Sequence, residues 1–431
     1  MKDPIILQRK DKLSISQESY WKDLLYRAVK IGTELEVAPD KGCDRPTFED
    51  AVRNALSPSG SLEQLGPNGV LDVSPEHCGI EIRIIGRQPH FDALLKQYTT
   101  IMDVVRRERA RPRSTCGLHF HILTPGLAEP VPEIILANLW NLTRRYAPEL
   151  KYLTSCGESR EALCRHRQYN SHLEMIRHSP SLESMSEIQQ VLKKSRIVPE
   201  HQNFFNLEHL GFMRDGDVLP FHVEFRFPDA DISALSVTAK TFLFLTLLLK
   251  SVDLSHYGLI HVGKVAPWKR KMELLNLLSN NDGNLATSDT AGISDEIIEE
   301  LRQGCHEMLD LLVPTFDYLD AIAPYQILEV LAESPISLMR CVGKDWDQID
   351  MWLNAHLPKV SELEMDQIDY RLMQHIELVE WSGQASKETW QWYAARELYI
   401  PPQDLECRLE KLRSLRGLRW DARRGTMVFG N

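Results

Sequence analysis

The sequence lacks the features of a secreted or disulfide-rich protein. Its 431 residues include eight cysteines, but these are scattered and form neither a Cys-x-x-Cys pair nor a dense framework. Such cysteine usage predicts a reduced, cytoplasmic protein. Residues 1–10 contain an apolar run of only three residues, which is too short for the core of a secretion signal.

Long hydrophobic runs and an excess of basic residues are also lacking. The strongest apolar run, residues 241–249, is far shorter than the ~20 residues that a membrane-spanning helix needs. We interpret it as part of a buried helix and expect no membrane partner. With 50 basic and 61 acidic residues the formal charge is −11, which disfavours a nucleic-acid-binding surface.

The sequence does contain a recurrent alternation of ionisable and apolar residues. It occurs in five segments, which are residues 33–37, 80–84, 118–122, 205–208 and 222–227. Side chains two residues apart on a strand point to the same face, so each segment predicts a strand with one polar and one apolar face. The polar positions are Glu34, Glu36, Glu81, Arg83, His119, His121, Asn206, Glu208, His222, Glu224 and Arg226.

A polar sheet face can simply be solvated, and this is the alternative interpretation. A solvated face usually mixes Thr, Ser, Lys and Gln, whereas carboxylate, imidazole and guanidinium groups recur here. We therefore predict an α+β fold in which a curved, mainly antiparallel sheet has a polar active-site face and helices on its apolar back.

The chain is longer than the ~250–300 residues at which single cores stop growing. We predict an N-terminal segment over 1–29, a catalytic domain over 30–255 and a mostly helical C-terminal region over 256–431. Apolar residues at helical spacing predict helices over 90–109 and 132–154, which would cover the back of the sheet. The C-terminal region shows no motif, and our hypothesis is that it closes over the site or selects a partner.

Several carboxylates on one concave face repel one another, and a hard divalent cation is a usual way to stabilise them. We therefore predict Mg²⁺ or Mn²⁺ as a cofactor. The predicted metal ligands are Glu34, Glu36, Glu81 and Glu224. His119 and His121 could instead ligate zinc, but no third ligand set typical of a zinc hydrolase is visible.

Arginines beside these acids suggest anion recognition. Arg83 and Arg226 suit bidentate binding of phosphate or carboxylate, or else they pair with the glutamates. Arg165 and Arg167 lie in a basic cluster that either binds an anion or forms a solvated helix face. Metal-binding acids beside arginines indicate phosphoryl transfer. Because no Gly-rich phosphate loop is present, the nucleotide would lie on the sheet itself.

The ordered motifs over residues 30–255 resemble the amidoligase family. They are Gly-Thr-Glu-Leu-Glu at 32–36, Leu-Asp-Val-Ser at 71–74 with Gly-Ile-Glu-Ile at 79–82, Cys-Gly-Leu-His-Phe-His at 116–121, Phe-Asn-Leu at 205–207 and His-Val-Glu-Phe-Arg at 222–226. That family is part of the carboxylate–amine ligase superfamily, with glutamine synthetase and glutamate–cysteine ligase.

The resemblance implies that ATP phosphorylates a substrate carboxylate and that an amine then attacks the acyl phosphate, which gives an amide or isopeptide bond. It implies catalytic roles for Arg226, Glu36 and Glu224. Residues implied to contact the nucleotide are His119, His121, Arg165, Arg167, Asn206 and Arg83. The amine and carboxylate could belong to small molecules, peptides or protein side chains.

Three other functions remain open from the residues. A hydrolase or deamidase on the same fold would use the same groups. A related phosphotransferase would release ADP without forming an amide. A catalytically inactive member would act as a nucleotide-binding scaffold, although such a protein has no need of mutually repelling acids.

Overall fold

The structure is a computed structural model that covers most of the predicted catalytic domain and much of the C-terminal region. It describes residues 6–8, 12–40, 44–56, 70–76, 79–85, 90–113, 116–124, 127, 129–156, 184, 186–188, 190, 205–209, 213–214, 217–218, 221–261, 295–356, 369, 372, 376, 391, 400–416, 418–421 and 426–429. Arg165, Arg167 and the leucine-rich segment near 271–278 lie outside these residues.

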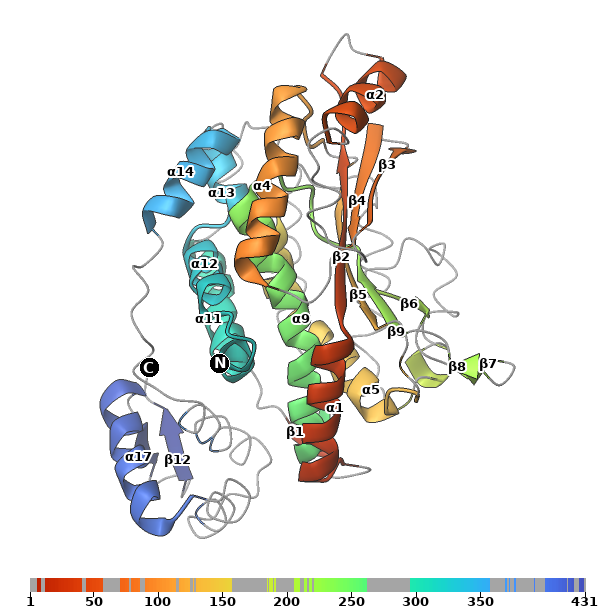
Figure 1. The fold of residues 1–431 in the computed structure, drawn as a ribbon. Coiled ribbons are helices and arrows are strands. Elements are labelled where there is room, and N and C mark those ends of the chain that lie inside the picture. Colours follow the sequence, from red (N-terminus) through yellow and green to blue (C-terminus); the bar gives the residue numbers. More distant parts are fainter. Residues whose placement is uncertain are drawn as a thin grey trace.

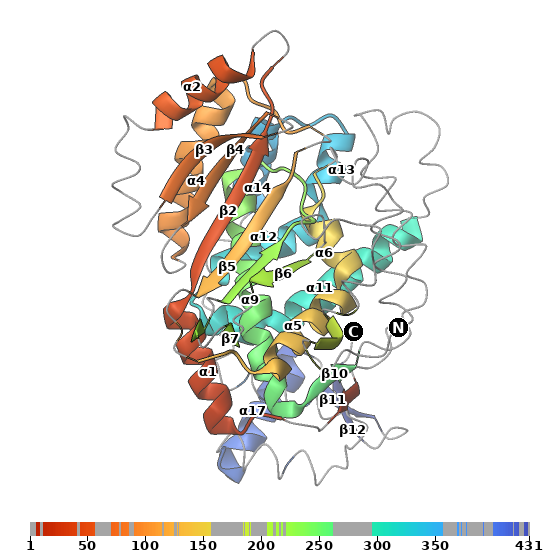
Figure 2. The same ribbon diagram turned by 90° about the vertical axis from the view of Figure 1, so that its right-hand side faces the viewer.

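A six-stranded sheet forms the front layer of the molecule (Figure 2). Its strand order is β3-β4-β2-β5-β9-β6, and every neighbouring pair is antiparallel. The strands are β2 (Lys30–Val37), β3 (Val70–Glu76), β4 (Gly79–Ile85), β5 (Leu118–Thr124), β6 (Phe205–His209) and β9 (Phe221–Phe225). All five alternating segments form strands of this one sheet, so the predicted fold class is confirmed.

A close approach at Gly79 helps to set the register of β4 against β2. A Cβ atom at this position would lie 2.3 Å from the carbonyl oxygen of Val37, so only glycine allows the two backbones to come so near. In the resulting register Glu81 lies opposite Glu36, and Arg83 lies opposite Glu34.

The apolar face of the sheet packs on helices, as predicted. Phe244 of α9 (Ala234–Tyr257) lies behind β5 and β9, with its ring centroid 4.7 Å from that of Phe120 and 4.3 Å from that of Phe225. Beside α9, the helix α4 (Phe91–Arg107) brings the hydroxyl of Tyr98 within 3.2 Å of Thr33 on β2. Figure 1 shows both helices along the back of the sheet.

Four helices of the C-terminal region form a third layer behind α9 (Figure 1). They are α11 (Asp295–Tyr318), α12 (Ile322–Glu333), α13 (Ile336–Cys341) and α14 (Trp346–His356). Because α9 has the sheet on one side and α11 and α12 on the other, its residues are buried around almost the whole circumference. These described helices lie away from the polar face, so they do not close over it.

The burial of α9 explains its composition. The helix is long and apolar enough to cross a membrane by those two measures alone, but the whole of its most apolar window is buried inside the protein. It therefore serves as a core helix.

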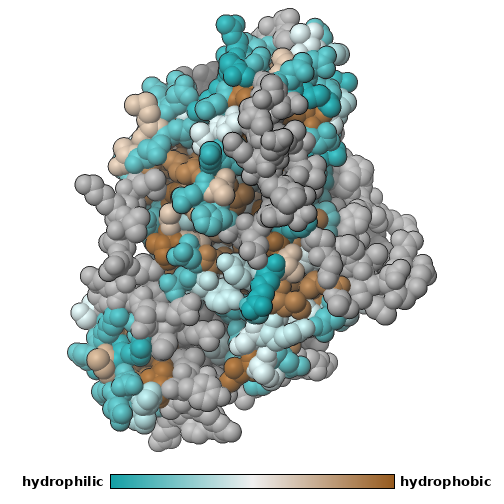
Figure 3. Space-filling model, in the orientation of Figure 1, coloured by the Kyte–Doolittle hydropathy of each residue, from teal (hydrophilic) through white to brown (hydrophobic). Residues whose placement is uncertain are grey.

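On the side of the molecule seen in Figure 3, hydrophobic residues occur in patches separated by hydrophilic ones.

The predicted helix over 132–154 is two helices, α5 (Glu133–Arg145) and α6 (Ala147–Thr154). The interruption at Tyr146 comes just before Pro148, whose ring and missing N–H cannot continue an α-helix from the preceding turn. Proline is tolerated in the first turn of a new helix, and α6 begins in that way.

The remaining elements lie at the ends of the chain or in connections. Ser14 caps α1 (Ile15–Ala28) in a capping box with Gln17. Near the C-terminus, β11 and β12 pair in an antiparallel manner. The other bounds are β1 (Ile6–Gln8), α2 (Arg45–Leu56), β7 (Met213–Arg214), β8 (Asp217–Val218), β10 (Leu259–His261), α17 (Pro402–Arg416), β11 (Leu418–Asp421) and β12 (Thr426–Phe429).

Candidate metal centre on the polar face

The strand register aligns the polar residues of three strands. Glu34 on β2 lies opposite His119 on β5, and His121 on β5 lies opposite Glu224 on β9. Directly opposed residues in antiparallel strands have Cβ atoms about 4.5–5.5 Å apart, so side chains on one face can meet. Segments more than 80 positions apart in the sequence are thereby brought to one place.

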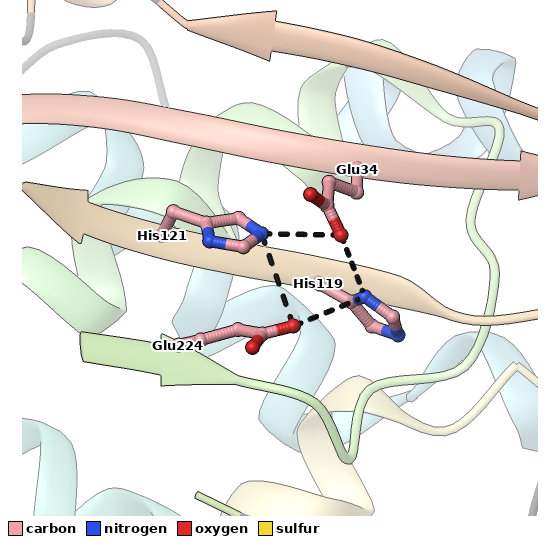
Figure 4. Close-up of side chains that lie close together, drawn as sticks. All are labelled: Glu34, His119, His121 and Glu224. Atoms are coloured by element: carbon pink, nitrogen blue, oxygen red, sulfur yellow. Dashed lines mark hydrogen bonds and ion pairs between the residues drawn. The ribbon is translucent and has the colours of Figure 1, made fainter. Parts of the chain in front are cut away.

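Four of these side chains form a compact cluster (Figure 4). Ligand atoms of Glu34, His119, His121 and Glu224 all lie within 4.8 Å of one another. His119 Nδ1 is 3.1 Å from Glu34 Oε2 and 3.3 Å from Glu224 Oε1. His121 Nε2 is 3.4 Å from the same Glu34 oxygen and 4.0 Å from the same Glu224 oxygen. Two imidazoles and two carboxylates thus point at a common centre.

The cluster is buried, which contradicts the interpretation as a solvated face. The exposed fractions of His119, His121 and Glu224 are 2%, 8% and 4%. Charged side chains are almost never buried to this extent unless they are paired or bind a metal. The buried groups therefore require one another or a bound ion.

His119 is held from both sides of its ring. Its Nδ1 faces the centre, while its Nε2 lies 3.6 Å from Glu36 Oε1. The other oxygen of Glu36 accepts a hydrogen bond of 2.7 Å from the backbone N–H of Gly117. A carboxylate behind a histidine orients the ring and favours a lone pair on the nitrogen that faces away from it.

Glu36 and Glu81 form a second pair of acids, beside the first cluster. They are directly opposed across β2 and β4, which is destabilising for like charges. Burial raises the pKa of Glu81, its bond with Arg83 lowers it, and the charge of Glu34 raises it again, so that the result lies above its ordinary value. The Glu81 carboxyl group is therefore in an environment that penalises its negative charge.

Glu34, unlike Glu81, has a lowered pKa. Burial raises the pKa of Glu34, but His119, which hydrogen-bonds it, and the nearby His121 lower it more strongly, so its pKa lies well below the ordinary value. Glu34 is consequently ionised and available as a ligand over the whole physiological pH range.

The two arginines on this face pair with the acids. Arg226 donates to Glu224 Oε1, and Arg83 contacts Glu81 Oε1 and lies 3.7 Å from Glu34 Oε1. The acids on this face outnumber the two arginines, so the face has an excess of negative charge when the histidines are neutral. A bound cation would offset this excess.

Three observations indicate that these four side chains are suited to bind a divalent cation. Carboxylate oxygens and imidazole nitrogens are both metal ligands, and the four groups converge. The Nε2 atom of His121 is buried and has no hydrogen-bond partner. The acids of this face outnumber its arginines, so a cation would offset their excess negative charge. Glu34, His119, His121 and Glu224 would therefore hold it.

The other predicted site residues are placed less completely. The backbone of Asn206 on β6 is opposite Glu224, so its position is adjacent to the centre. Asp72 on β3, which was not among the predicted site residues, lies opposite Arg83 on the same polar face. Arg165 and Arg167 are outside the described residues, and their predicted nucleotide contacts stay predictions.

His222 makes a contact that the sequence did not reveal. Its Nε2 atom lies 2.8 Å from Nδ1 of His121, on the side of that ring turned away from the centre. The alternation along β9 places His222 on the polar face, but only the register of β9 against β5 brings it to His121.

Fold and site together define an α+β protein with a buried acidic and imidazole-containing centre on an antiparallel sheet. No protein-family model matches the sequence, and a search of curated proteins finds no match. Among solved structures, the complex between the prokaryotic ubiquitin-like protein Pup and its ligase PafA is similar, with a TM-score of 0.35 and 10% sequence identity. The alignment covers 92% of this chain and 85% of that chain. A likeness this weak carries no argument about activity.

Proposed function

We propose that the protein is an ATP-dependent carboxylate–amine ligase that forms an amide or isopeptide bond. The observation that carries this proposal is the convergence of Glu34, His119, His121 and Glu224 within 4.8 Å, with Arg226 bonded to Glu224. Metal-binding acids next to a guanidinium group suit phosphoryl transfer, and the sequence motifs at these same positions resemble the amidoligase family.

The residues of the centre would have distinct roles. Glu34 and Glu224, with His119 and His121, would hold a divalent cation, Mg²⁺ or Mn²⁺, which would supply positive charge to offset that of the ATP phosphates. Glu36 and Glu81, whose positions are directly opposed across β2 and β4, would hold a further ion. Arg226, whose side chain is 18% exposed, would turn its guanidinium group to the phosphoryl group during transfer.

The proposed reaction has two steps. An oxygen of the substrate carboxylate attacks the γ-phosphorus of ATP, the bond to the β,γ-bridging oxygen breaks, and ADP leaves. The amine nitrogen then attacks the carbonyl carbon of the acyl phosphate, inorganic phosphate leaves, and the amine gives up a proton. Buried walls would keep water from the acyl phosphate, since water would otherwise hydrolyse it.

Hydroxylamine gives a direct test, because it is a small amine that converts an acyl phosphate into a stable hydroxamate. The full-length protein would be incubated with ATP, Mn²⁺ or Mg²⁺, hydroxylamine and pools of carboxylates, including protein side chains. ADP release that requires a carboxylate and is accompanied by equal hydroxamate formation would support a ligase. ADP release without hydroxamate would support a phosphotransferase instead.

A metal-dependent hydrolase is the second candidate. The observation that favours it is the presence of two imidazoles in the centre, because hydrolytic zinc sites commonly combine histidine with a carboxylate. Amide hydrolysis by the metal-loaded protein without ATP would support this function and contradict the ligase.

The proposal also includes the cellular compartment in which the reaction takes place. We propose a cytoplasmic enzyme, on the ground that the eight cysteines are scattered and form neither a Cys-x-x-Cys pair nor a dense framework.

A further inference from the structure

His121 and His222 form a hydrogen-bonded pair of imidazoles at the edge of the centre. Their rings are stacked, with centroids 5.1 Å apart and an angle of 30° between the ring planes, and Nδ1 of His121 is 2.8 Å from Nε2 of His222. A bond between two ring nitrogens needs one N–H and one lone pair. The pair therefore couples the position of the proton on one ring to that on the other.

The second nitrogen of His121 has a different environment. Its Nε2 atom is buried without a hydrogen-bond partner, although Glu34 Oε2 and Glu224 Oε1 lie 3.4 and 4.0 Å away. An unsatisfied buried polar atom is costly, and a cation in the centre would remove that cost. To bind the cation, Nε2 must present its lone pair, so the ring hydrogen must be on Nδ1 and be donated to His222.

The kind of ion matters for this arrangement. Imidazole nitrogens suit transition metals such as Zn²⁺, Fe²⁺ and Co²⁺, whereas Mg²⁺ prefers oxygen ligands and keeps several of its waters. A centre with two carboxylates alone would suit Mg²⁺. The orientation of the imidazoles thus affects binding of a transition metal far more than binding of Mg²⁺.

We propose that His222 is a positioning residue, which accepts a hydrogen bond from His121 Nδ1 and so gives the centre a preference for divalent transition-metal ions over Mg²⁺. This inference deepens the proposed function, since it rests on a cation at the same centre. Glu36 has the corresponding position behind His119, so both imidazoles of the centre are held from the side away from the ion.

The test is titration of the metal-free full-length protein with Co²⁺ and, separately, with Mg²⁺, without nucleotide. Calorimetry gives the affinities, and the visible absorption of Co²⁺ reports its ligand geometry. The variants are His222→Ala, His222→Gln, whose amide oxygen can accept the same hydrogen bond, and the control His306→Ala. His306 is on α11, in the third layer, where it pairs with Glu333.

Wild-type protein should bind Co²⁺ more tightly than Mg²⁺. His222→Ala should lower the Co²⁺ affinity about 10–100-fold and change the Co²⁺ spectrum, as expected for loss of a group that orients a metal-binding histidine. The Mg²⁺ affinity should not change. His222→Gln should restore part of the Co²⁺ affinity, and His306→Ala should behave as wild type.

The proposal is overturned if His222→Ala keeps the wild-type Co²⁺ affinity and spectrum, if it weakens both metals equally, or if wild-type protein prefers Mg²⁺. Circular dichroism shows whether His222→Ala is folded, and if it is not, His222→Gln decides. The hydroxamate assay is independent of this result. Ligation with an unchanged His222→Ala titration would refute only this inference, whereas the expected titrations without ligation would refute only the ligase.

Discussion

The ammonium group of Lys240 lies 2.6 Å from a carboxylate oxygen of Asp231, and both side chains are completely buried. A second buried pair, Lys151 and Asp229, is 2.8 Å apart. Both acids belong to the connection between β9 and α9, which begins next to Arg226. The two pairs thus hold the segment that follows Arg226 in place. Because both pairs are buried, water does not compete with the lysines for hydrogen bonds to the carboxylates.

Lys240→Met should lower the free energy of unfolding by about 3–5 kcal/mol, because Asp231 would keep a buried charge without its partner. Adding Asp231→Asn should recover part of that loss, since the amide can still accept hydrogen bonds from the backbone of Ser233. Urea denaturation measures both. Lys96→Met, at an exposed position on α4, is the control and should change stability by less than about 0.5 kcal/mol. Equal stability of Lys240→Met and wild type would contradict the argument.

Glu224→Gln and Glu36→Gln should each reduce hydroxamate formation by on the order of 100-fold while the protein remains folded. The first loses a ligand charge, and the second loses the carboxylate behind His119. Without metal, both variants should be at least as thermostable as wild type, because repulsion between unligated acids falls. Glu299→Gln on the exposed side of α11 should have normal activity. A variant that unfolds both with and without Mg²⁺ would show that these glutamates are structural.

Asp350 on α14 should make stability depend on pH. It accepts a hydrogen bond of 2.5 Å from Ser233 and pairs with Arg106. Burial raises the pKa of Asp350, its bonds to Ser233 and Arg106 lower it, and the charge of Asp231 raises it, for a net value above the ordinary 3.8. A raised pKa means that the folded state favours the protonated acid. The contribution is therefore fully present below pH 3.8 and is lost as the pH rises through the folded-state pKa.

Replacement by Asn removes this titration. The free energy of unfolding of wild type minus that of Asp350→Asn should consequently fall as the pH is raised from about 4 toward 7. Urea denaturation of both proteins across this range measures the difference. A difference that stays constant or grows with pH would be the wrong sign for a raised pKa.

Removal of residues 295–431 should destroy the fold of the remainder rather than only its selectivity. The truncation would expose the side of α9 that packs on α11 and α12, where Leu312 and Leu328 are fully buried. An exposed apolar surface of this kind promotes aggregation. Size-exclusion chromatography and circular dichroism would detect the change. A monomeric, folded 1–294 fragment would show that the C-terminal helices are dispensable for the core.

The alternation of polar and apolar residues was sufficient to predict five of the six strands of the sheet and their polar face. Side chains alternate between the two faces of a strand, so Leu118, Phe120 and Ile122 share the apolar face of β5, where they are buried. The position of α9 was less predictable. Its run of apolar residues indicates burial, but only the structure shows that a third layer of helices is the reason.

The composition of the centre was predicted incompletely because register is a long-range property. The sequence indicates that Glu36, Glu81 and Glu224 share a face, yet it does not tell which of them meet. The structure joins Glu224 with Glu34 and two histidines, and pairs Glu36 with Glu81 instead. The contact of His222 with His121 also depends on pairing between strands about 100 positions apart in sequence, which local patterns do not encode.

The four residues of the centre come from three strands, β2, β5 and β9, and they meet only when the sheet is assembled. An ion bound there would favour the native state over the unfolded chain, in which these ligands are far apart. At a free metal concentration 100 times its dissociation constant, such an ion would add about 2.7 kcal/mol to the free energy of unfolding. The metal would then act as a folding cofactor, so a depleted cell would lose the protein itself as well as its activity.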